Sequence, residues 1–297
     1  MIEDQLISLL QEIEIDPINI CNRSCSFCPR GQGYKNTKDR LTVEISHAIN
    51  KSLREIEFSN IITFCGKGEP LLHKRLEEHI KIILSGIYPR QVLLVCNGDR
   101  VTPERLKSLK EAGVTDIRIS LYDSDTSANF MLMNESVGLK MGFRHNYHGV
   151  NFEVNRNEIL DNVKKDPISR SCYYPFTNTI IDFNGDVLLC CNDWTKKAKF
   201  GNLLTSSMKD IWCSKRLNAI RDRLAQSKRD FFPCSACDVD GCLSGQKQFE
   251  YYVEMQQNKV EEALDQEAVL DHFNQERQQI EQGIRKHATD KANAQST

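Results

Sequence analysis

Three closely spaced cysteines near the start of the chain are the residues whose chemistry is easiest to interpret. Cys21, Cys25 and Cys28 lie in the segment CNRSCSFC, with C-x3-C-x2-C spacing. Three such thiolates can hold three corners of a [4Fe–4S] cluster and leave the fourth iron without a protein ligand. A small molecule can bind that open iron and accept an electron. A zinc site remains an alternative, but it would need a fourth ligand from elsewhere in the chain.

Most of the other cysteines lie in the second half of the chain. The total of 12 cysteines is high for a cytosolic enzyme and too sparse for a small disulfide scaffold. The first residues are acidic and lack the basic region of a secretory signal, so metal-bound thiolates are favoured over disulfides. One alternative is a four-thiolate zinc site made by Cys172, Cys190, Cys234 and Cys237.

Composition excludes several other classes of protein. Of the 297 residues, 40% are hydrophobic and 27% are charged, which rules out a wholly disordered chain. The formal net charge is −2, so bulk positive charge cannot provide affinity for nucleic acid. No apolar run approaches the roughly 20 residues that cross a bilayer. We therefore expect a cytoplasmic protein with no nucleic-acid or membrane partner.

The elements that must position the first cysteines alternate between strands and helices. Hydrophobic patterning predicts strands at 13–20, 61–64, 92–95 and 117–121, with weaker strands at 139–144 and 152–154. It predicts helices at 41–56, at 72–85 and from Thr102-Pro103 to near Gly113. Repeated strand–helix units indicate a parallel sheet covered by helices.

The pattern changes near residue 164. Residues 179–190 predict a β-hairpin, with Asn184-Gly185 as its turn, and residues 208–224 predict one amphipathic helix. From about residue 246 the chain is polar and helix-prone, and we expect its last dozen residues to be disordered. Cys213, Cys65 and Cys96 are expected to be small buried apolar side chains, the last two near the mouth of the active site.

The segment CNRSCSFC resembles the cluster loop of the radical S-adenosylmethionine (SAM) superfamily, including the aromatic Phe27 before its last cysteine. The resemblance implies that the amino and carboxylate groups of SAM chelate the open iron. An electron then cleaves SAM to methionine and a 5′-deoxyadenosyl radical, which abstracts a substrate hydrogen. It also implies that Cys21, Cys25 and Cys28 are cluster ligands and that Phe27 lies near the adenine.

A second segment, GKGEP at residues 66–70, stands where the family has GGEP. Lys67 replaces the first glycine of that motif. Gly68 still lets the backbone approach a ligand, and the carboxylate of Glu69 can accept hydrogen bonds from the amino group of SAM. By itself the motif could be a surface turn, but its place after the second strand favours the SAM-binding interpretation.

Two further polar residues follow strands, where ligands of parallel α/β folds bind. Asn97 ends the third predicted strand and Ser120 ends the fourth, so both are candidates for binding SAM. The resemblance implies a contact of Ser120 with the ribose or carboxylate of SAM, and the alternative for both is an ordinary polar residue at the end of a strand. The segment 154–157 resembles an Arg-containing stretch of radical SAM dehydrogenases of aminocyclitol biosynthesis. Arg156 is therefore the candidate for substrate contact, with an ordinary surface arginine as the alternative.

The second cysteine group resembles the C-terminal extension called SPASM, or its shorter relative, the twitch domain. The matching features are Cys172, Gly185-x4-Cys190, Cys234-x2-Cys237 and the segment 210–212. Because no cysteine follows Cys242, the resemblance implies one auxiliary [4Fe–4S] cluster, held by Cys172, Cys190, Cys234 and Cys237. Cys191 could replace Cys190, and Cys242 could be an extra ligand.

Together these features predict an α/β protein: a partial (β/α)6 TIM-like barrel followed by a small hairpin-plus-helix twitch/SPASM-like domain. We expect the radical SAM core at 10–165, the auxiliary domain at 166–246 and a polar helical tail at 247–297.

The resemblance implies oxidation of a small polyol, sugar or aminocyclitol by two electrons, with the auxiliary cluster as electron acceptor. A flavodoxin or ferredoxin reductase system would supply electrons. Only about a dozen residues precede the first predicted strand, too few for a domain that binds a leader peptide, which favours a small substrate. Modification of a peptide or protein is the alternative, and a non-catalytic metal-binding module is a third hypothesis.

Overall fold

In the computed structural model, the described residues are 2–146, 156, 159–160, 168, 170–239, 243–257, 273–275 and 277–278. Within them, eight strands form one sheet in the order β5-β4-β3-β2-β1-β6-β7-β8. All neighbours from β5 to β6 are parallel, and the last two pairs are antiparallel. The strands are β1 (Glu12–Ile15), β2 (Ile61–Phe64), β3 (Gln91–Cys96), β4 (Asp116–Leu121), β5 (Lys140–His145), β6 (Asn178–Ile181), β7 (Asp186–Leu188) and β8 (Lys199–Asn202).

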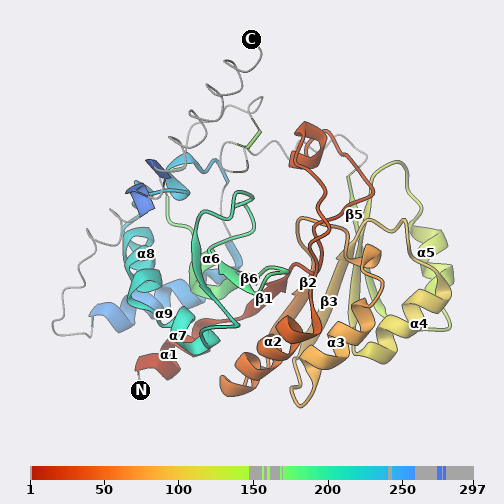
Figure 1. Cartoon of the computed structure of the whole chain (residues 1–297), viewed down its shortest axis with the longest axis horizontal. Coiled ribbons are helices and arrows are strands. Elements are labelled where there is room, and N and C mark those ends of the chain that lie inside the picture. The colour runs from red at the N-terminus through yellow and green to blue at the C-terminus, as the bar shows by residue number, and fades with distance from the viewer. Residues whose placement is uncertain are drawn as a thin grey trace, which may run out of the picture.

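Helices α2 to α5 alternate with the first strands and lie along one side of the sheet (Figure 1). They are α2 (Val43–Glu55), α3 (Leu76–Leu84), α4 (Pro103–Ala112) and α5 (Ser127–Asn134). The side chain of Thr42 accepts a hydrogen bond from the backbone of Ile45 at the start of α2, and Thr102 caps α4 in the same way. Gly113 ends α4 with φ +109°, a left-handed conformation that favours glycine.

Strand β1 lies in the middle of the sheet, between β2 and β6. Successive side chains of a strand point to opposite faces. Ile13 and Ile15 are fully buried in the hydrophobic core, so Glu12, Glu14 and Asp16 share the other face. This alternation places three carboxyl groups along one side of the central strand.

The predicted hairpin is confirmed, but its first strand does more than pair with β7. Strand β6 also pairs in parallel with β1, with Asn178 opposite Glu12 and Ile181 opposite Ile15. Gly185, in the turn, has φ +83°. The second half of the chain therefore extends the same sheet as the first half.

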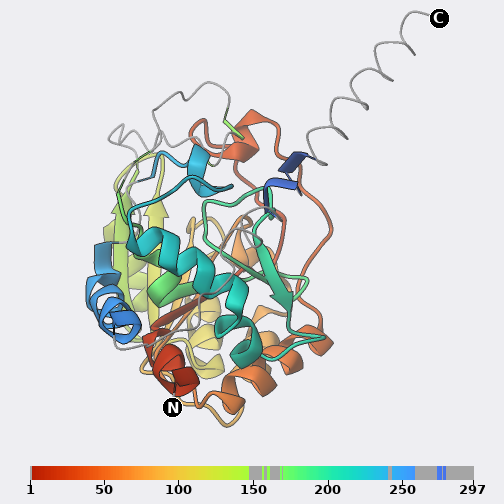
Figure 2. The same cartoon turned by 90° about the vertical axis from the view of Figure 1, so that its left-hand side faces the viewer.

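The remaining helices gather beside the hairpin end of the sheet, which Figure 2 turns toward the viewer. They are α1 (Ile2–Leu9), α6 (Tyr174–Thr177), α7 (Met208–Trp212), α8 (Lys215–Ala225) and α9 (Gln246–Gln257). The prediction of one helix over 208–224 is wrong, because α7 ends before Cys213 and Ser214 caps the new helix α8.

Several boundaries also differ from the prediction. Strand β1 ends at Ile15, before Pro17, and does not continue to residue 20. Helices α1 and α5 and strand β8 were not anticipated. The strand predicted at 152–154 and the last dozen residues lie outside the described part of the chain. Among the described residues, no helix is both long and apolar enough to span a membrane.

Candidate functional site

A cavity of about 1020 Å³ opens at the carboxyl ends of the parallel strands. Residues from both halves of the sequence form its walls. Every site residue predicted from the sequence lines this one cavity: Cys21, Cys25, Phe27, Cys28, Gly68, Glu69, Asn97, Ser120, Arg156, Cys172, Cys190, Cys234 and Cys237. Residues up to 216 positions apart in sequence are therefore brought to one site.

The first three cysteines lie on the loop that follows β1, and all are half-buried. The backbone N–H of Cys28 donates to the carbonyl of Cys25 at 3.0 Å, which turns the loop back on itself. Burial raises the pKa of the Cys21 and Cys25 thiols. Since the thiolate is the metal ligand, binding of a metal cluster would have to release these protons.

Arg23, between the first two cysteines, fixes this loop to the ends of β3 and β4. Its guanidinium forms a bidentate pair with Asp99, at 2.7 and 2.5 Å, and a second ion pair with Asp123 at 2.9 Å. The pair with Arg23 lowers the pKa of the Asp99 carboxyl. A bidentate Arg–carboxylate pair defines geometry as well as charge, so Arg23 sets the position of the loop. The sequence analysis did not identify it.

The GKGEP segment approaches the cysteine loop very closely. A Cβ atom at Gly68 would lie 1.9 Å from the carbonyl oxygen of Ile18, so only glycine fits there. The backbone N–H of Glu69 donates to the carbonyl of Ile20 at 2.8 Å. The buried side chain of Arg30 donates from Nε to the carbonyl of Lys67 at 2.6 Å and so joins the two loops.

Glu69 is buried at the wall of the cavity, with 3% of its surface exposed. Its Oε1 accepts from the backbone N–H of Leu71 at 3.0 Å, and its Oε2 accepts from that of Asn97 at 2.8 Å. Burial raises its pKa to about 7 despite these hydrogen bonds. A cationic group bound beside Glu69 would favour the ionised form, which suits the contact expected with an amino group.

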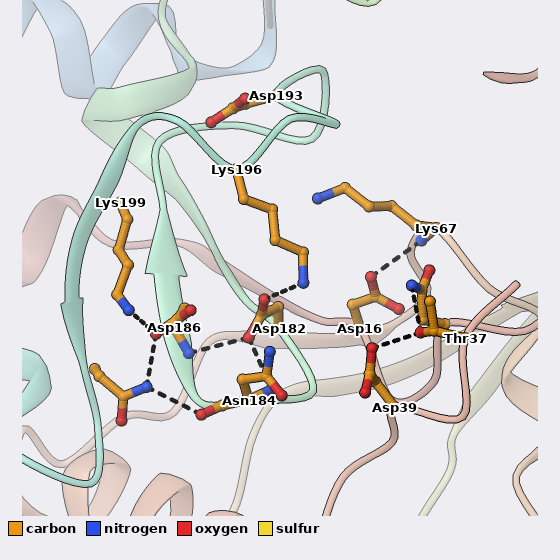
Figure 3. A network of polar contacts seen from close by, with 12 residues as sticks. Asp16, Thr37, Asp39, Lys67, Asp182, Asn184, Asp186, Asp193, Lys196 and Lys199 are labelled. Atoms are coloured by element: carbon orange, nitrogen blue, oxygen red, sulfur yellow. Dashed lines mark hydrogen bonds and ion pairs between the residues drawn. The ribbon is translucent and has the colours of Figure 1, made fainter. Parts of the chain in front are cut away.

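Lys67, the departure from the family motif, lies in a network of charged side chains (Figure 3). Its backbone N–H donates to Asp16 at 3.2 Å, and the other carboxylate oxygen of Asp16 is buried with no hydrogen-bond partner among the described residues. Burial raises the pKa of Asp16 to about 6 and lowers that of Lys67. Asp182, at the end of β6, pairs with Lys196 at 2.5 Å. The charges of Asp182 and Lys196 act on Asp16, so the electrostatic network spans both halves of the chain.

Polar and aromatic groups complete the side of the cavity near β3 and β4. Asn97 is buried, and its side chain donates to that of Asn22 at 2.9 Å. Ser120 is also buried. The ring of Phe27 stacks on Tyr122, with centroids 6.0 Å apart and an angle of 18°. Tyr122 was missed in the sequence, although it stands just beyond the end of β4. This aromatic pair provides a flat apolar surface of the kind that a nucleobase can contact.

Three cysteines of the second group lie at the base of the hairpin. Tyr174, Ile180 and Leu188 form a small apolar cluster, against which Cys172, Cys190 and Cys191 pack. Burial raises the pKa of the Cys190 and Cys234 thiols well above its ordinary value. Cys190 and Cys191 both line the cavity, so both alternatives stay open. Cys242 lies outside the described residues.

Three cysteines were not predicted to be cluster ligands. Cys96 is buried at the end of β3, and both it and Cys65 line the cavity. Cys213 is half-buried and packs against the main hydrophobic core; it is not among the cavity-lining residues.

Both groups offer thiolates, the ligands of iron–sulfur clusters. One presents three cysteines on a single loop, and the other presents four or five from separate segments. In the part of the chain that the structure describes, no three His, Cys, Asp or Glu side chains are arranged to hold one metal ion. A single zinc ion would draw its thiolates to about 2.3 Å from one point, whereas the corners of an iron–sulfur cube are spread apart. The donor chemistry of both groups fits clusters.

Arg156 reaches the cavity from a stretch of which few residues are described. Its backbone has φ +50°, and its guanidinium donates to the side chain of Asn192. Its Nε is buried without a hydrogen-bond partner among the described residues. An unpartnered donor at the wall of a cavity can serve a bound ligand.

Comparison with known families agrees with this architecture. Residues 15–163 match the radical SAM superfamily, and residues 172–238 match SPASM, an iron–sulfur cluster-binding domain. The chain belongs to the radical SAM superfamily and carries a SPASM-type domain. The predictions of the family, the fold class and the enzymatic class are therefore confirmed, as is the use of SAM, a SAM-binding [4Fe–4S] cluster and an auxiliary iron–sulfur cluster.

Individual proteins of known sequence and structure are similar to this chain. The S-adenosyl-L-methionine-dependent 2-deoxy-scyllo-inosamine dehydrogenase of Niallia circulans is 25% identical over 228 residues, covering 76% of this chain and 90% of the relative. The crystal structure of BtrN in complex with AdoMet and 2-DOIA has a TM-score of 0.67 and 24% identity, covering 78% of this chain and 94% of that one. anSMEcpe with bound AdoMet has a TM-score of 0.52 and 13% identity, covering 89% of this chain and 98% of that one. The structural likenesses show the fold.

Proposed function

We propose that this radical SAM enzyme oxidises a secondary alcohol of a small polyol, sugar or aminocyclitol to a ketone by removing two electrons. The observation that carries the proposal is the single cavity that both cysteine groups border. A substrate bound there would lie between a site for hydrogen abstraction and a site for electron removal. The dehydrogenase of Niallia circulans, similar over 90% of its length, supports an aminocyclitol as the first substrate to test.

Cys21, Cys25 and Cys28 would hold the SAM-binding cluster, whose open iron supplies the reductive cleavage of SAM. Gly68 and Glu69 would receive the amino-acid end of SAM, because Glu69 is a buried carboxylate on the cavity wall.

The other end of SAM would lie against the remaining predicted contacts. Phe27 would face the adenine together with Tyr122, and Asn97 and Ser120 would offer polar contacts from the ends of β3 and β4.

Cys172, Cys190, Cys234 and Cys237 would hold the auxiliary cluster, with Cys191 as the alternative to Cys190. We infer a domain boundary near residue 165, and Arg156 just before it would contact the substrate. A reductase of the flavodoxin or ferredoxin type would supply the electron for SAM cleavage, which fits a cytoplasmic enzyme.

The size of the cavity favours a small substrate over a peptide. Small-molecule sites commonly have volumes of roughly 300–1,000 Å³. The cavity here measures about 1020 Å³, and SAM and the clusters must occupy part of it. The remaining space suits a single ring better than a peptide segment.

The test uses anaerobically reconstituted, reduced protein with SAM and 2-deoxy-scyllo-inosamine or related polyols deuterated at the carbinol carbon. Mass spectrometry should find deuterium in 5′-deoxyadenosine and an equal amount of ketone. If no polyol transfers deuterium while SAM is cleaved, the proposed substrate class is wrong. If no SAM is cleaved under any condition, the protein is the non-catalytic metal-binding module.

A further inference from the structure

Oxidation of an alcohol releases a proton as well as two electrons, so the proposed function needs a proton acceptor in the cavity. Three carboxyl groups line it: Glu12 and Glu14 of β1, and Asp16 just after the end of that strand. Both oxygens of Glu12 accept strong hydrogen bonds, from Thr63 at 2.6 Å and Asn178 at 2.9 Å. Neither oxygen of Glu12 is therefore left without a strong donor that a substrate hydroxyl would have to displace.

Glu14 has a different set of partners. Its Oε1 accepts from the hydroxyl of Tyr174 at 2.7 Å, and its Oε2 accepts only a weak hydrogen bond from the thiol of Cys65 at 3.4 Å. Both partners also line the cavity. One oxygen is thus held in place while the other has a partner that a substrate hydroxyl can readily displace, since a thiol is a weak donor.

Glu14 also lies close to the auxiliary cysteines. Its partner Tyr174 packs with Ile180 and Leu188 in the cluster that contacts Cys172, Cys190 and Cys191. The hydrogen bond between Glu14 and Tyr174 therefore connects the central strand of the core to the side of the cavity where an electron would leave. Loss of a proton and loss of an electron from one substrate carbinol could then occur on the same wall.

The side chains that donate hydrogen bonds to Glu14 are unsuited to accept a proton. The Tyr174 hydroxyl and the Cys65 thiol both donate hydrogen bonds to Glu14, so neither is placed to accept a proton from a substrate. Arginine offers only donors, which excludes Arg156. Burial raises the pKa of Glu14 to about 7, and the charge of Glu12 adds to this rise, whereas the hydrogen bonds from Tyr174 and Cys65 and the charge of Arg144 oppose it. Cys191 also interacts electrostatically with Glu14.

We propose that Glu14 accepts the hydroxyl proton of the substrate during its oxidation, a role that rests on the proposed function. The C–H hydrogen atom leaves to the 5′-deoxyadenosyl radical and gives 5′-deoxyadenosine. The O–H bond of the remaining carbon radical then breaks, its proton passes to the Glu14 carboxylate, and the C=O bond forms. The remaining electron would pass to the auxiliary iron–sulfur cluster that Cys172, Cys190, Cys234 and Cys237 would hold, which balances the reaction.

The experiment compares the wild type, Glu14→Gln and the matched control Glu12→Gln, which removes the same charge from the same face of β1. Ketone and deuterated 5′-deoxyadenosine are measured with deuterated substrate from pH 6 to pH 8.5. For Glu14→Gln, deuterated 5′-deoxyadenosine should persist, while ketone per 5′-deoxyadenosine falls about 100-fold or more, the usual range for loss of a general base. An organic radical should also become detectable by electron paramagnetic resonance.

The pH profile gives a second readout. Because the acceptor works as the carboxylate, the wild-type ratio should rise through about pH 7 and level off above it. Tyr174→Phe removes a donor that favours the ionised form, so the midpoint should move to higher pH. In Glu14→Gln the rise should be absent.

Each outcome has a definite meaning. An unchanged ratio in Glu14→Gln, or a pH profile identical in all variants, overturns the role of Glu14 and leaves the proposed function intact. If the wild type makes no ketone from any polyol, the proposed function is wrong and the role of Glu14 is rejected with it. If Glu14→Gln does not fold, the midpoint shift of Tyr174→Phe decides the proposal.

Discussion

The two cysteine groups of this protein are built in opposite ways. The first comes from one eight-residue loop, held by polar contacts such as the ion pairs of Arg23 with Asp99 and Asp123. The second is collected from separate segments: Cys172 and Cys190 pack against apolar side chains at the hairpin, and Cys234 packs against the main hydrophobic core. Cluster binding by the first group should therefore be sensitive to changes within its own loop. Cluster binding by the second group should depend on the folding of all the segments that supply its cysteines.

The largest expected effect follows from the local loop. We expect Cys25→Ala to abolish formation of 5′-deoxyadenosine, because two thiolates cannot anchor the cluster whose open iron binds SAM. Chromatography of the reaction products and an iron count would measure this. Cys213→Ala is a matched control, since that thiol is not among the cavity-lining residues. Full SAM cleavage by Cys25→Ala would contradict the assignment of the first group.

The contrasting variant, Cys237→Ala, should keep some SAM cleavage and lose ketone formation. Because its site joins distant segments, loss of the auxiliary cluster should also lower the melting temperature more than Cys25→Ala does. Scanning calorimetry of both variants after anaerobic reconstitution would compare their melting temperatures. Equal melting temperatures would contradict the claim that the second group stabilises the fold more than the first. Unchanged ketone formation would contradict its electron-accepting role.

A smaller effect is expected at the contact between the two loops of the SAM side. In Gly68→Ala, the new methyl group would meet the carbonyl of Ile18, so the segment carrying Glu69 must move. We expect a destabilisation of about 1–3 kcal/mol and weaker SAM binding, measured by thermal unfolding and calorimetric titration. Gly142→Ala in β5 is the control, since a Cβ there has no atom within 4 Å. SAM affinity equal to that of the wild type would show that the close approach is unimportant.

The same contrast explains what could be predicted from the sequence. The cysteine loop, the caps at Thr102 and Gly113 and the hairpin turn at Gly185 depend on neighbours in sequence, and their patterns indicated them correctly. The parallel pairing of β6 with β1 joins residues far apart in sequence, and no local pattern encodes it.

The site shows the same limit. The side chains of Arg23 and Tyr122 acquire their roles from partners across the cavity, so they were missed. The segment EIEID did carry a usable signal, since its acidic residues alternate with buried isoleucines. The sequence analysis interpreted it as a buried strand. This is correct for the isoleucine face, whereas the acidic face lines the cavity. Helix α5 escaped detection because its apolar residues Met131 and Leu132 are exposed and do not form one buried face.

The smallest effect concerns Lys67, which lies in the charged network between the first and second halves of the chain. Burial raises the pKa of Asp16 to about 6, above its ordinary value of 3.8, and the charge of Lys67 opposes this rise. A carboxyl group whose pKa is higher in the folded state binds more protons when folded. The free energy of unfolding therefore falls as pH rises from about 4 to 6 and stays lower above that range.

Lys67→Met should raise the pKa of Asp16 further and extend this loss of stability to higher pH. The variant should be less stable than the wild type by on the order of 1 kcal/mol at pH 8, with a smaller difference at pH 5, because Asp16 is then protonated in both folded proteins. Urea unfolding at the two pH values would measure the difference, with the exposed Lys81→Met on α3 as the control. If the free energy of unfolding of Lys67→Met and Lys81→Met changes with pH in the same way, the charge of Lys67 does not stabilise the ionised form of Asp16.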